Sequence, residues 1–452
     1  MKSPQKFDLR LLREIEATVG RGREEARSLA AIGEEDRIPV TITLAEEAKV
    51  GAVEPGERSL ESALAGDRPK KSPVAKFLAK IGADEVDELP LSNSLVVELT
   101  PRQIQQLDEE RELLNDIEQV RLVKREEVTC LHHSVQVIEA RPYVWEGLQH
   151  TGNGVKVAIL DSGVDKNHPA LAGKVVSEFD TSGEGVGVPG SHGTHVAGIV
   201  ASQNGFRRGV APDCDLINGK VLTSFGFGTH VDVEQGMQLA FQQGADVVNM
   251  SLGWSHIFHG WKCDDGFCSL CRAATALVKL GVVVVVAAGN EDNLAAQQNP
   301  AVDTSLRCPG QCRDVITVGA VDNAKELASF SSVGPASYVV DGWTVNIHFP
   351  FSLNVVLPRP AEPWWTKPDV CAPGVDVNST VTGSGWAAFS GTSMASPHVA
   401  GIAALMLDKD PKLSPQTVKN LIKHTAESLK DTYTRDQVGD GVANAYTAVL
   451  HA

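Results

Sequence analysis

Three side chains of this sequence belong to the types that together hydrolyse amide bonds. Asp161 follows the apolar run 155–160, His192 lies in Ser-His-Gly-Thr-His-Val-Ala-Gly, and Ser393 lies in Gly-Thr-Ser-Met-Ala-Ser-Pro-His-Val-Ala-Gly. A serine hydroxyl is a weak nucleophile until a base accepts its proton, and a carboxylate can orient a histidine base. Donors for the developing oxyanion are also needed. These residues are therefore candidates for a nucleophilic site.

The segment beyond Gly152 alternates short apolar strands with amphipathic helices, which predicts a parallel, doubly wound α/β sheet. Functional sites in such sheets form beyond the carboxyl ends of the strands, and Asp161 and Asn290 both stand after predicted strands. A helix predicted over 394–406 begins at Ser393, and its free amide groups are suited to hold an oxyanion. The predicted strands are 155–160, 215–222, 245–250, 282–287 and 315–318.

The motifs around these residues resemble the three signature segments of the subtilisin-like serine proteases. They are Asp161-Ser162-Gly163, the segment 192–198 and the segment 391–401, in the order Asp, His, Ser that this family has. The resemblance runs from about 155 to 405. It implies a three-layer α/β/α domain and a serine endopeptidase that works through an acyl-enzyme.

The resemblance also implies a role for each candidate residue. Ser393 matches the nucleophile, His192 the general base and then acid, and Asp161 the group that fixes the imidazole tautomer. Asn290 matches the family's side-chain donor to the oxyanion. A catalytically silent binding scaffold is the alternative, and the presence of all four residues disfavours it.

Substrate binding follows from the same resemblance, because the family binds an extended peptide as an added β-strand. Ser251-Leu252-Gly253 resembles the strand that lines the P1 pocket. Gly226-Phe227-Gly228 resembles the opposite edge of the groove. Protein or peptide substrates are therefore the expected partners.

The N-terminal part divides into two further regions. Residues 1–37 read as a charged helical extension. Residues 38–133 read as a small α+β domain, and a weaker resemblance to the family's propeptides implies a chaperone and inhibitor that is removed autocatalytically. Its last strand is predicted over 120–128, which places the cut within 129–135, beside His132. The catalytic domain is then 134–452, with insertions near 254–272 and 336–367.

The sequence departs from the family at the usual calcium site. Ala170 stands where an aspartate is expected, and the loop 203–209 is short and carries two arginines. Calcium prefers several oxygen ligands, ideally anionic. We therefore expect that this calcium site is missing, and we expect no metal or other cofactor to be required for catalysis.

Five of the eight cysteines gather in one region of the sequence. The pattern C-x₂-C followed by C-x₃-C allows a structural zinc site with four thiolates, but two disulfides or reduced thiols fit equally. These alternatives stay open at the level of sequence. The five residues are Cys263, Cys268, Cys271, Cys308 and Cys312.

Composition and charge exclude several other classes of protein. The formal net charge of -16 argues against a nucleic-acid partner, since phosphate backbones attract basic surfaces. The longest apolar run, 281–288, is far shorter than the roughly 20 residues of a transmembrane helix. The N-terminus shows no secretory signal pattern, which favours a cytoplasmic or non-classically exported protein and leaves the compartment unknown.

Overall fold

The computed structural model divides into two units. The first comprises residues 1–51, 64–124 and 342–357, and the second comprises 52–63, 125–341 and 358–452. The predicted N-terminal helix within 1–37 lies outside the described residues. The residues that the structure describes are 38–44, 72–83, 86–89, 94–100, 103, 106, 117–122, 126–127, 137–140, 143–204, 207–254, 268–291, 305–334, 343–349, 351–357 and 365–452.

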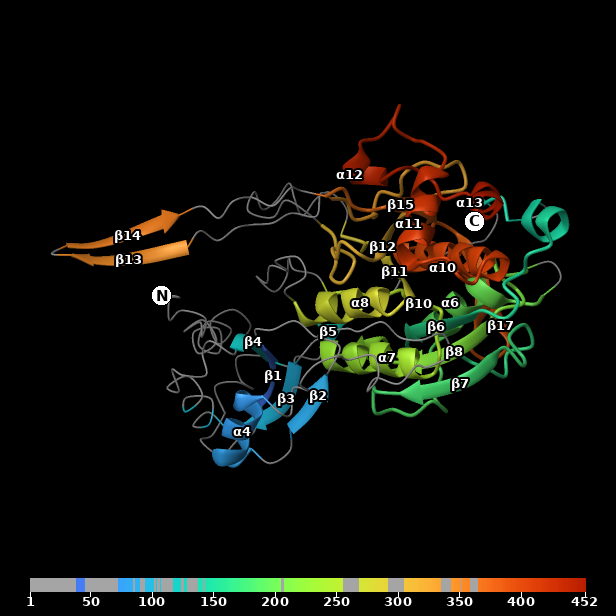
Figure 1. Ribbon diagram of the computed structural model, residues 1–452. Coiled ribbons are helices and arrows are strands. Elements are labelled where there is room, and N and C mark those ends of the chain that lie inside the picture. The colour runs from blue at the N-terminus through green and yellow to red at the C-terminus, as the bar shows by residue number, and fades with distance from the viewer. Residues whose placement is uncertain are drawn as a thin grey trace. The chain divides into compact units, whose positions relative to one another are not determined.

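A seven-stranded sheet in the order β15-β12-β11-β10-β6-β8-β7 is the centre of the second unit (Figure 1). Every pair of neighbours in it is parallel. All five residues of β11 are buried, as expected for a central parallel strand covered on both faces. The strands are β6 (Lys156–Asp161), β7 (Val175–Asp180), β8 (Asp215–Lys220), β10 (Val247–Met250), β11 (Val283–Ala287), β12 (Ile316–Val321) and β15 (Val370–Pro373).

Helices cover both faces of this sheet. Val157 and Ile159 of β6 point into a core shared with α6 (Ser191–Ala201) and α10 (Thr392–Lys409). On the other face, a Cβ on Gly236 of α7 would lie 2.2 Å from a Val221 methyl, so α7 (His230–Gln242) can pack this closely only with glycine. Figure 1 shows α7 and α8 (Ser269–Lys279) together on this side of the sheet. The predicted three-layer α/β/α fold is confirmed.

Smaller elements complete the second unit. Helices α11 (Pro415–His424) and α13 (Ala445–His451) join the core of α10, and β16 (Val377–Val381) pairs antiparallel with β17 (Gly385–Phe389). The others are β5 (Glu126–Glu127), β9 (Phe227–Gly228), the π-helical turn η3 (Tyr143–Leu148) and α12 (Arg435–Val438). Among the described helices, none is long and apolar enough to cross a membrane.

The first unit contains a four-stranded antiparallel sheet in the order β2-β3-β1-β4, with one described helix. Ser72 caps that helix by accepting a hydrogen bond from Ala75 N, and the helix buries Leu78 with Leu95 and Leu99 of the sheet. This architecture is the α+β type expected for 38–133. The elements are β1 (Ile38–Leu44), α4 (Pro73–Lys80), β2 (Val86–Leu89), β3 (Ser94–Leu99) and β4 (Ile117–Leu122).

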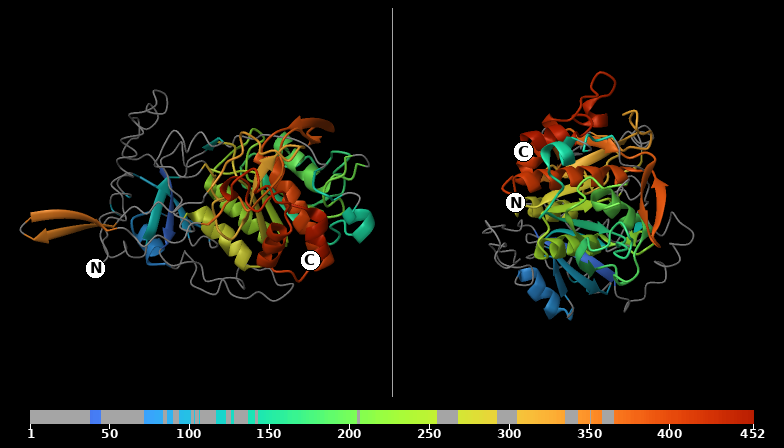
Figure 2. Two further views of the ribbon diagram at one scale, coloured as in Figure 1. Left: turned by 90° about the horizontal axis from the view of Figure 1, so that it is seen from above. Right: turned by 90° about the vertical axis from the view of Figure 1, so that its right-hand side faces the viewer.

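The second predicted insertion, 336–367, contains an antiparallel ribbon, orange in Figures 1 and 2. It consists of β13 (Trp343–Phe349) and β14 (Phe351–Leu357), with Trp343 opposite Leu357. The first insertion, 254–272, is described at both of its ends but not over 255–267.

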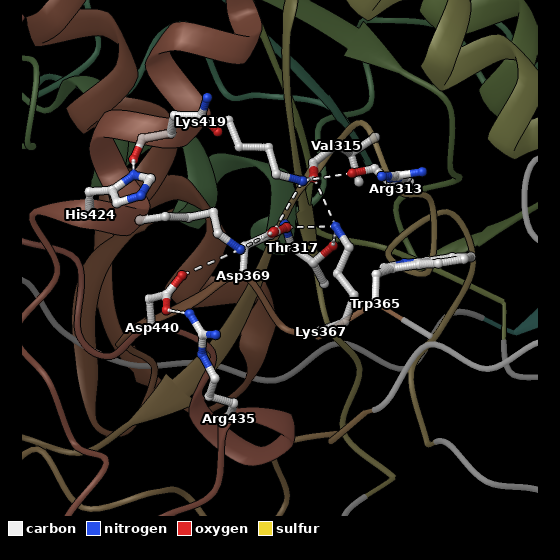
Figure 3. A network of polar contacts seen from close by, with 12 residues as sticks. Arg313, Val315, Thr317, Trp365, Lys367, Asp369, Lys419, His424, Arg435 and Asp440 are labelled. Atoms are coloured by element: carbon white, nitrogen blue, oxygen red, sulfur yellow. Dashed lines mark hydrogen bonds and ion pairs between the residues drawn. The ribbon is translucent and has the colours of Figure 1, made fainter. Parts of the chain in front are cut away.

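A buried ion network joins β12, the segment just before β15, and α11 (Figure 3). The carboxylate of Asp369 accepts from Lys367 Nζ at 2.6 Å, from Lys423 Nζ at 3.0 Å and from Thr317 N at 2.9 Å, and it pairs with Lys419 at 3.0 Å. Burial alone would raise the pKa of Asp369, but the three lysines outweigh it and hold the pKa well below its ordinary value. The network thus fastens α11 to the sheet edge through buried charges.

Candidate active site

Asp161 and His192 meet at the carboxyl end of β6. Asp161 is the last residue of β6 and is fully buried, and His192 is the second residue of α6. His192 Nδ1 lies 2.7 Å from Asp161 Oδ1. Because a carboxylate only accepts hydrogen bonds, Nδ1 must carry the proton of this contact, and the neutral ring then keeps its basic lone pair on Nε2.

The first turn of α6 approaches β6 closely because it contains glycine. A Cβ on Gly193 would lie 2.6 Å from the Gly163 carbonyl oxygen and 3.2 Å from Asp161 Cβ. The Asp161 carboxylate also accepts from Ser162 N at 2.6 Å, which fixes its orientation. Glycine at position 193 therefore follows from the close approach of the helix to the strand.

Ser393 is the second residue of α10, and its backbone is tied to Ser251. Pro397 lacks an N–H group, so the Ser393 carbonyl has no helical donor four residues on. That carbonyl instead accepts from Ser251 Oγ at 2.7 Å, while Ser393 Oγ donates to the Ser251 carbonyl at 3.1 Å. The serine motif and the segment after β10 are thus held by two reciprocal hydrogen bonds.

The side chain of Asn290 is oriented by Thr392. Thr392 N donates to Asn290 Oδ1 at 2.9 Å, and Thr392 Oγ1 lies 3.1 Å from the same oxygen. A backbone N–H can only donate, so the amide oxygen faces Thr392 and the NH₂ group points away from it. The preceding Gly289 has φ +119°, and a Cβ there would also lie 2.7 Å from Ser332 Oγ, which explains the glycine.

The two predicted substrate-binding segments lie beside strands of the second unit. Ser251, Leu252 and Gly253 follow β10 and are buried. Gly226 N donates to Thr223 O at 2.8 Å, which forms the turn before β9, and Phe227 and Gly228 form β9 itself.

A short segment already pairs with the β9 edge. Glu126 lies opposite Gly228 and Glu127 opposite Phe227, in antiparallel register. The sequence predicted one strand over 120–128, but the structure has β4, which ends at Leu122 in the four-stranded sheet, and the separate strand β5. The predicted cut within 129–135 lies outside the described residues.

An ion pair that sequence analysis missed lies beside the predicted P1 segment. Arg307 Nε donates to Glu291 Oε1 at 2.5 Å, and Arg307 Nη1 donates to Gly253 O at 3.3 Å. The Glu291 carboxylate also accepts from Asn290 N at 3.1 Å. Both charged side chains are largely buried, at 11% and 7% exposure. Arg307 does not lie in a recognisable sequence motif, so only the tertiary structure identifies it as a partner of Glu291.

The two other histidines of the motifs pack within the fold. His195 Nε2 lies 3.0 Å from the Val377 carbonyl oxygen, and its ring stacks on Phe389 at 4.2 Å. His398 Nδ1 donates to the Met394 carbonyl at 2.8 Å, and burial lowers the pKa of His398 to about 4. A histidine that stays neutral and bonded within its own helix is a packing residue rather than a base.

Two regions of the second unit bear on metal binding. At the predicted missing calcium site, the Ala170 carbonyl accepts from Gln203 N at 2.9 Å. Within the described part of the chain, the group of convergent metal-binding side chains is Cys268, Cys271 and Cys308. None of the six described cysteines forms a disulfide.

Comparison with known proteins gives one consistent family. The model of the subtilase family matches residues 152–441. Subtilisin DY of Bacillus licheniformis is 37% identical over 303 residues, which cover 66% of this chain and 92% of that protein. A subtilisin of Bacillus pumilus is 35% identical over 306 residues, again 66% and 92%. The serine protease AprX of Bacillus subtilis is 33% identical over 373 residues, 75% of this chain and 76% of that protein.

Proposed function

Since this chain belongs to the subtilase family and is a serine endopeptidase, we propose that it is made as a zymogen whose residues 38–133 act as a chaperone and inhibitor. We assign the chemistry to Ser393, His192, Asp161 and Asn290. The 2.7 Å contact between His192 and Asp161 beside the serine helix is the observation that carries this assignment.

The reaction begins when the Ser393 hydroxyl turns from the Ser251 carbonyl toward His192. His192 Nε2 takes the proton as Ser393 Oγ adds to the scissile carbonyl carbon. His192 then gives this proton to the leaving amine, and the C–N bond breaks to leave an acyl ester on Ser393. A water molecule, deprotonated by His192, hydrolyses the ester, and the proton returns to Ser393 Oγ. Asp161 stabilises the imidazolium at each stage.

The oxyanion has two proposed donors. Thr392 holds the Asn290 oxygen, so the Asn290 NH₂ group is presented on the opposite side for a developing negative charge. The Ser393 N–H lies in the first turn of α10, where backbone amides have no helical acceptor and the helix dipole favours an anion. Both donors are fixed before the reaction, so they need little reorganisation.

The pairing of β5 with β9 supports the zymogen proposal. An antiparallel strand added to Gly226-Phe227-Gly228 is how this family is expected to receive a peptide, and here Glu126 and Glu127 occupy that edge. The chain then continues through 129–135, which we propose to be cut beside His132. After cleavage, the segment would stay bound as a product until the propeptide is degraded.

Intact mass and N-terminal sequencing test both proposals on the full chain. The wild-type protein is expected to yield a new N-terminus within 129–135 and to hydrolyse labelled casein. Ser393→Ala should remain uncut and inactive, whereas Ser428→Ala, an exposed serine outside the site, should behave as wild type. A cut and active Ser393→Ala protein would refute the nucleophile. A mature N-terminus before 110 or after 150, with activity retained, would refute only the propeptide boundary.

A further inference from the structure

Three cysteine sulfurs converge in the second unit, away from the catalytic residues in sequence. Cys268 and Cys271 lie at the start of α8, and Cys308 lies 37 residues beyond Cys271. Cys308 Sγ is 3.0 Å from Cys268 Sγ and 3.1 Å from Cys271 Sγ. All three side chains are buried, with 2% exposure or less.

We propose that these three thiolates bind a structural zinc ion. A disulfide joins only two sulfurs. It would leave the third thiol buried beside the bond, and it would not explain why three sulfurs converge. Thiolates around zinc stand about 3.8 Å apart, since Zn–S bonds are about 2.3 Å long and the geometry is tetrahedral. The sulfurs are therefore within about 1 Å of the zinc-bound spacing. Their soft thiolate character matches zinc rather than calcium or magnesium.

The start of α8 is suited to hold negative sulfur. Cys268 is the N-cap residue, and its sulfur accepts a hydrogen bond from Cys271 N at 3.3 Å. The positive end of the dipole of this 11-residue helix lies at the same place. Both interactions favour thiolate over thiol, which is the form that binds the metal.

Cys312 is our assignment for the fourth ligand. Its sulfur lies 3.7 Å from the Cys271 carbonyl oxygen and 3.2 Å from Thr275 Oγ1, both on α8. With Cys308 it completes the C-x₃-C half of the pattern. Cys263, the other cysteine of the region, lies outside the described residues.

A zinc ion here would brace the wall of the predicted P1 pocket. Cys308 and Trp254 exchange two backbone hydrogen bonds of 3.0 Å, and Trp254 directly follows Ser251-Leu252-Gly253. Cys308 also follows Arg307, whose side chain contacts Gly253. The ion would thus link α8 to both of these segments.

Zinc content of the purified full chain tests the site. The Ser393→Ala background prevents self-digestion, and reducing conditions prevent adventitious oxidation. We expect about one zinc per chain to survive gel filtration, and Cys271→Ser to lower this content by on the order of tenfold or more. The matched control is Cys371→Ser, because Cys371 is buried alone in the core.

Two results with the parent chain would overturn the proposal: no metal bound after reconstitution with zinc, or, in protein purified without reductant, a mass two hydrogens lower with Cys308 in a disulfide. Loss of zinc in Cys263→Ser but not in Cys312→Ser would overturn the fourth ligand alone. Cobalt reconstitution of the parent chain needs no cysteine variant to fold. It should give thiolate-to-metal charge-transfer bands and the intense visible bands of a tetrahedral site, and their absence would count against the site.

Discussion

Removal of the Asp369 carboxylate should strongly destabilise the catalytic unit. The substitution Asp369→Ala leaves the Lys367 and Lys419 side chains, which are 1% and 9% exposed, without their counter-charge (Figure 3). Breaking a buried ion pair by removal of one partner costs about 3–5 kcal/mol, which for a unit of this size corresponds to a fall of about 6–10 °C in Tm.

The defect should depend on pH in a defined direction. Burial lowers the pKa of Lys367 to about 7, against the opposing attraction of Asp369. Without Asp369 this pKa falls further, so Lys367 loses its proton in the folded variant at lower pH than in the parent. The unfolded chain keeps its lysine protonated there, and the stability of the variant therefore rises with pH relative to the parent. We expect a larger defect at pH 5 than at pH 8.

The contribution of Asp369 to stability should also change with pH in acidic solution. The pKa of Asp369 is lowered by the three lysines, so its contribution to stability is fully present above the ordinary value of 3.8. It is lost as the pH falls below that value toward the folded-state pKa. The parent and Asp369→Ala should thus converge in strongly acidic solution.

Calorimetry and urea unfolding in the Ser393→Ala background measure these effects without self-digestion. The control is Glu427→Gln, which breaks the surface pair of Lys325 with Glu427, a side chain that is 48% exposed. An exposed pair contributes about 0–1 kcal/mol. A Tm of Asp369→Ala within about 1 °C of the parent, or equal losses in both variants, would refute the reasoning.

Four further predictions concern activity and maturation. Asn290→Ala should lower kcat by about 10²–10³ with little change in KM, as loss of the side-chain oxyanion donor does in subtilisin; an unchanged kcat in steady-state assays would exclude Asn290. Glu291→Gln leaves Arg307 without its counter-charge and should raise kcat/KM for peptides with an acidic P1 residue relative to alanine by on the order of tenfold; equal ratios would place the pair outside the pocket. Because Ala170 replaces an expected calcium ligand, protein that is treated with EGTA and then supplied with zinc alone should recover the Tm of the untreated parent; a requirement for calcium would contradict this. Prolines across 129–133 should block maturation in gel assays, because they remove the N–H groups of an added strand; normal processing would refute the substrate-like tail.

Much of the fold was predictable because its signals are local. The valine-rich run of β11 and the alternation of strands with helices predicted the parallel sheet, since strands buried on both faces must be apolar throughout. The split between β4 and β5 was not predictable, because 120–128 reads as one strand until its partners are known. The strands that pair with each other are distant in sequence, and periodicity alone does not identify them.

The sequence by itself determined the family, the chemistry and the candidate residues Asp161, His192, Ser393 and Asn290, because each sits in a motif whose glycines and prolines serve the local backbone. Only the tertiary structure decided which distant side chains meet. It paired Arg307 with Glu291 and brought Cys308 to the start of α8. Such contacts bring together residues that are tens of positions apart in the chain. Packing of the whole core, and not any local pattern, determines which distant residues meet, so these contacts cannot be predicted from local sequence.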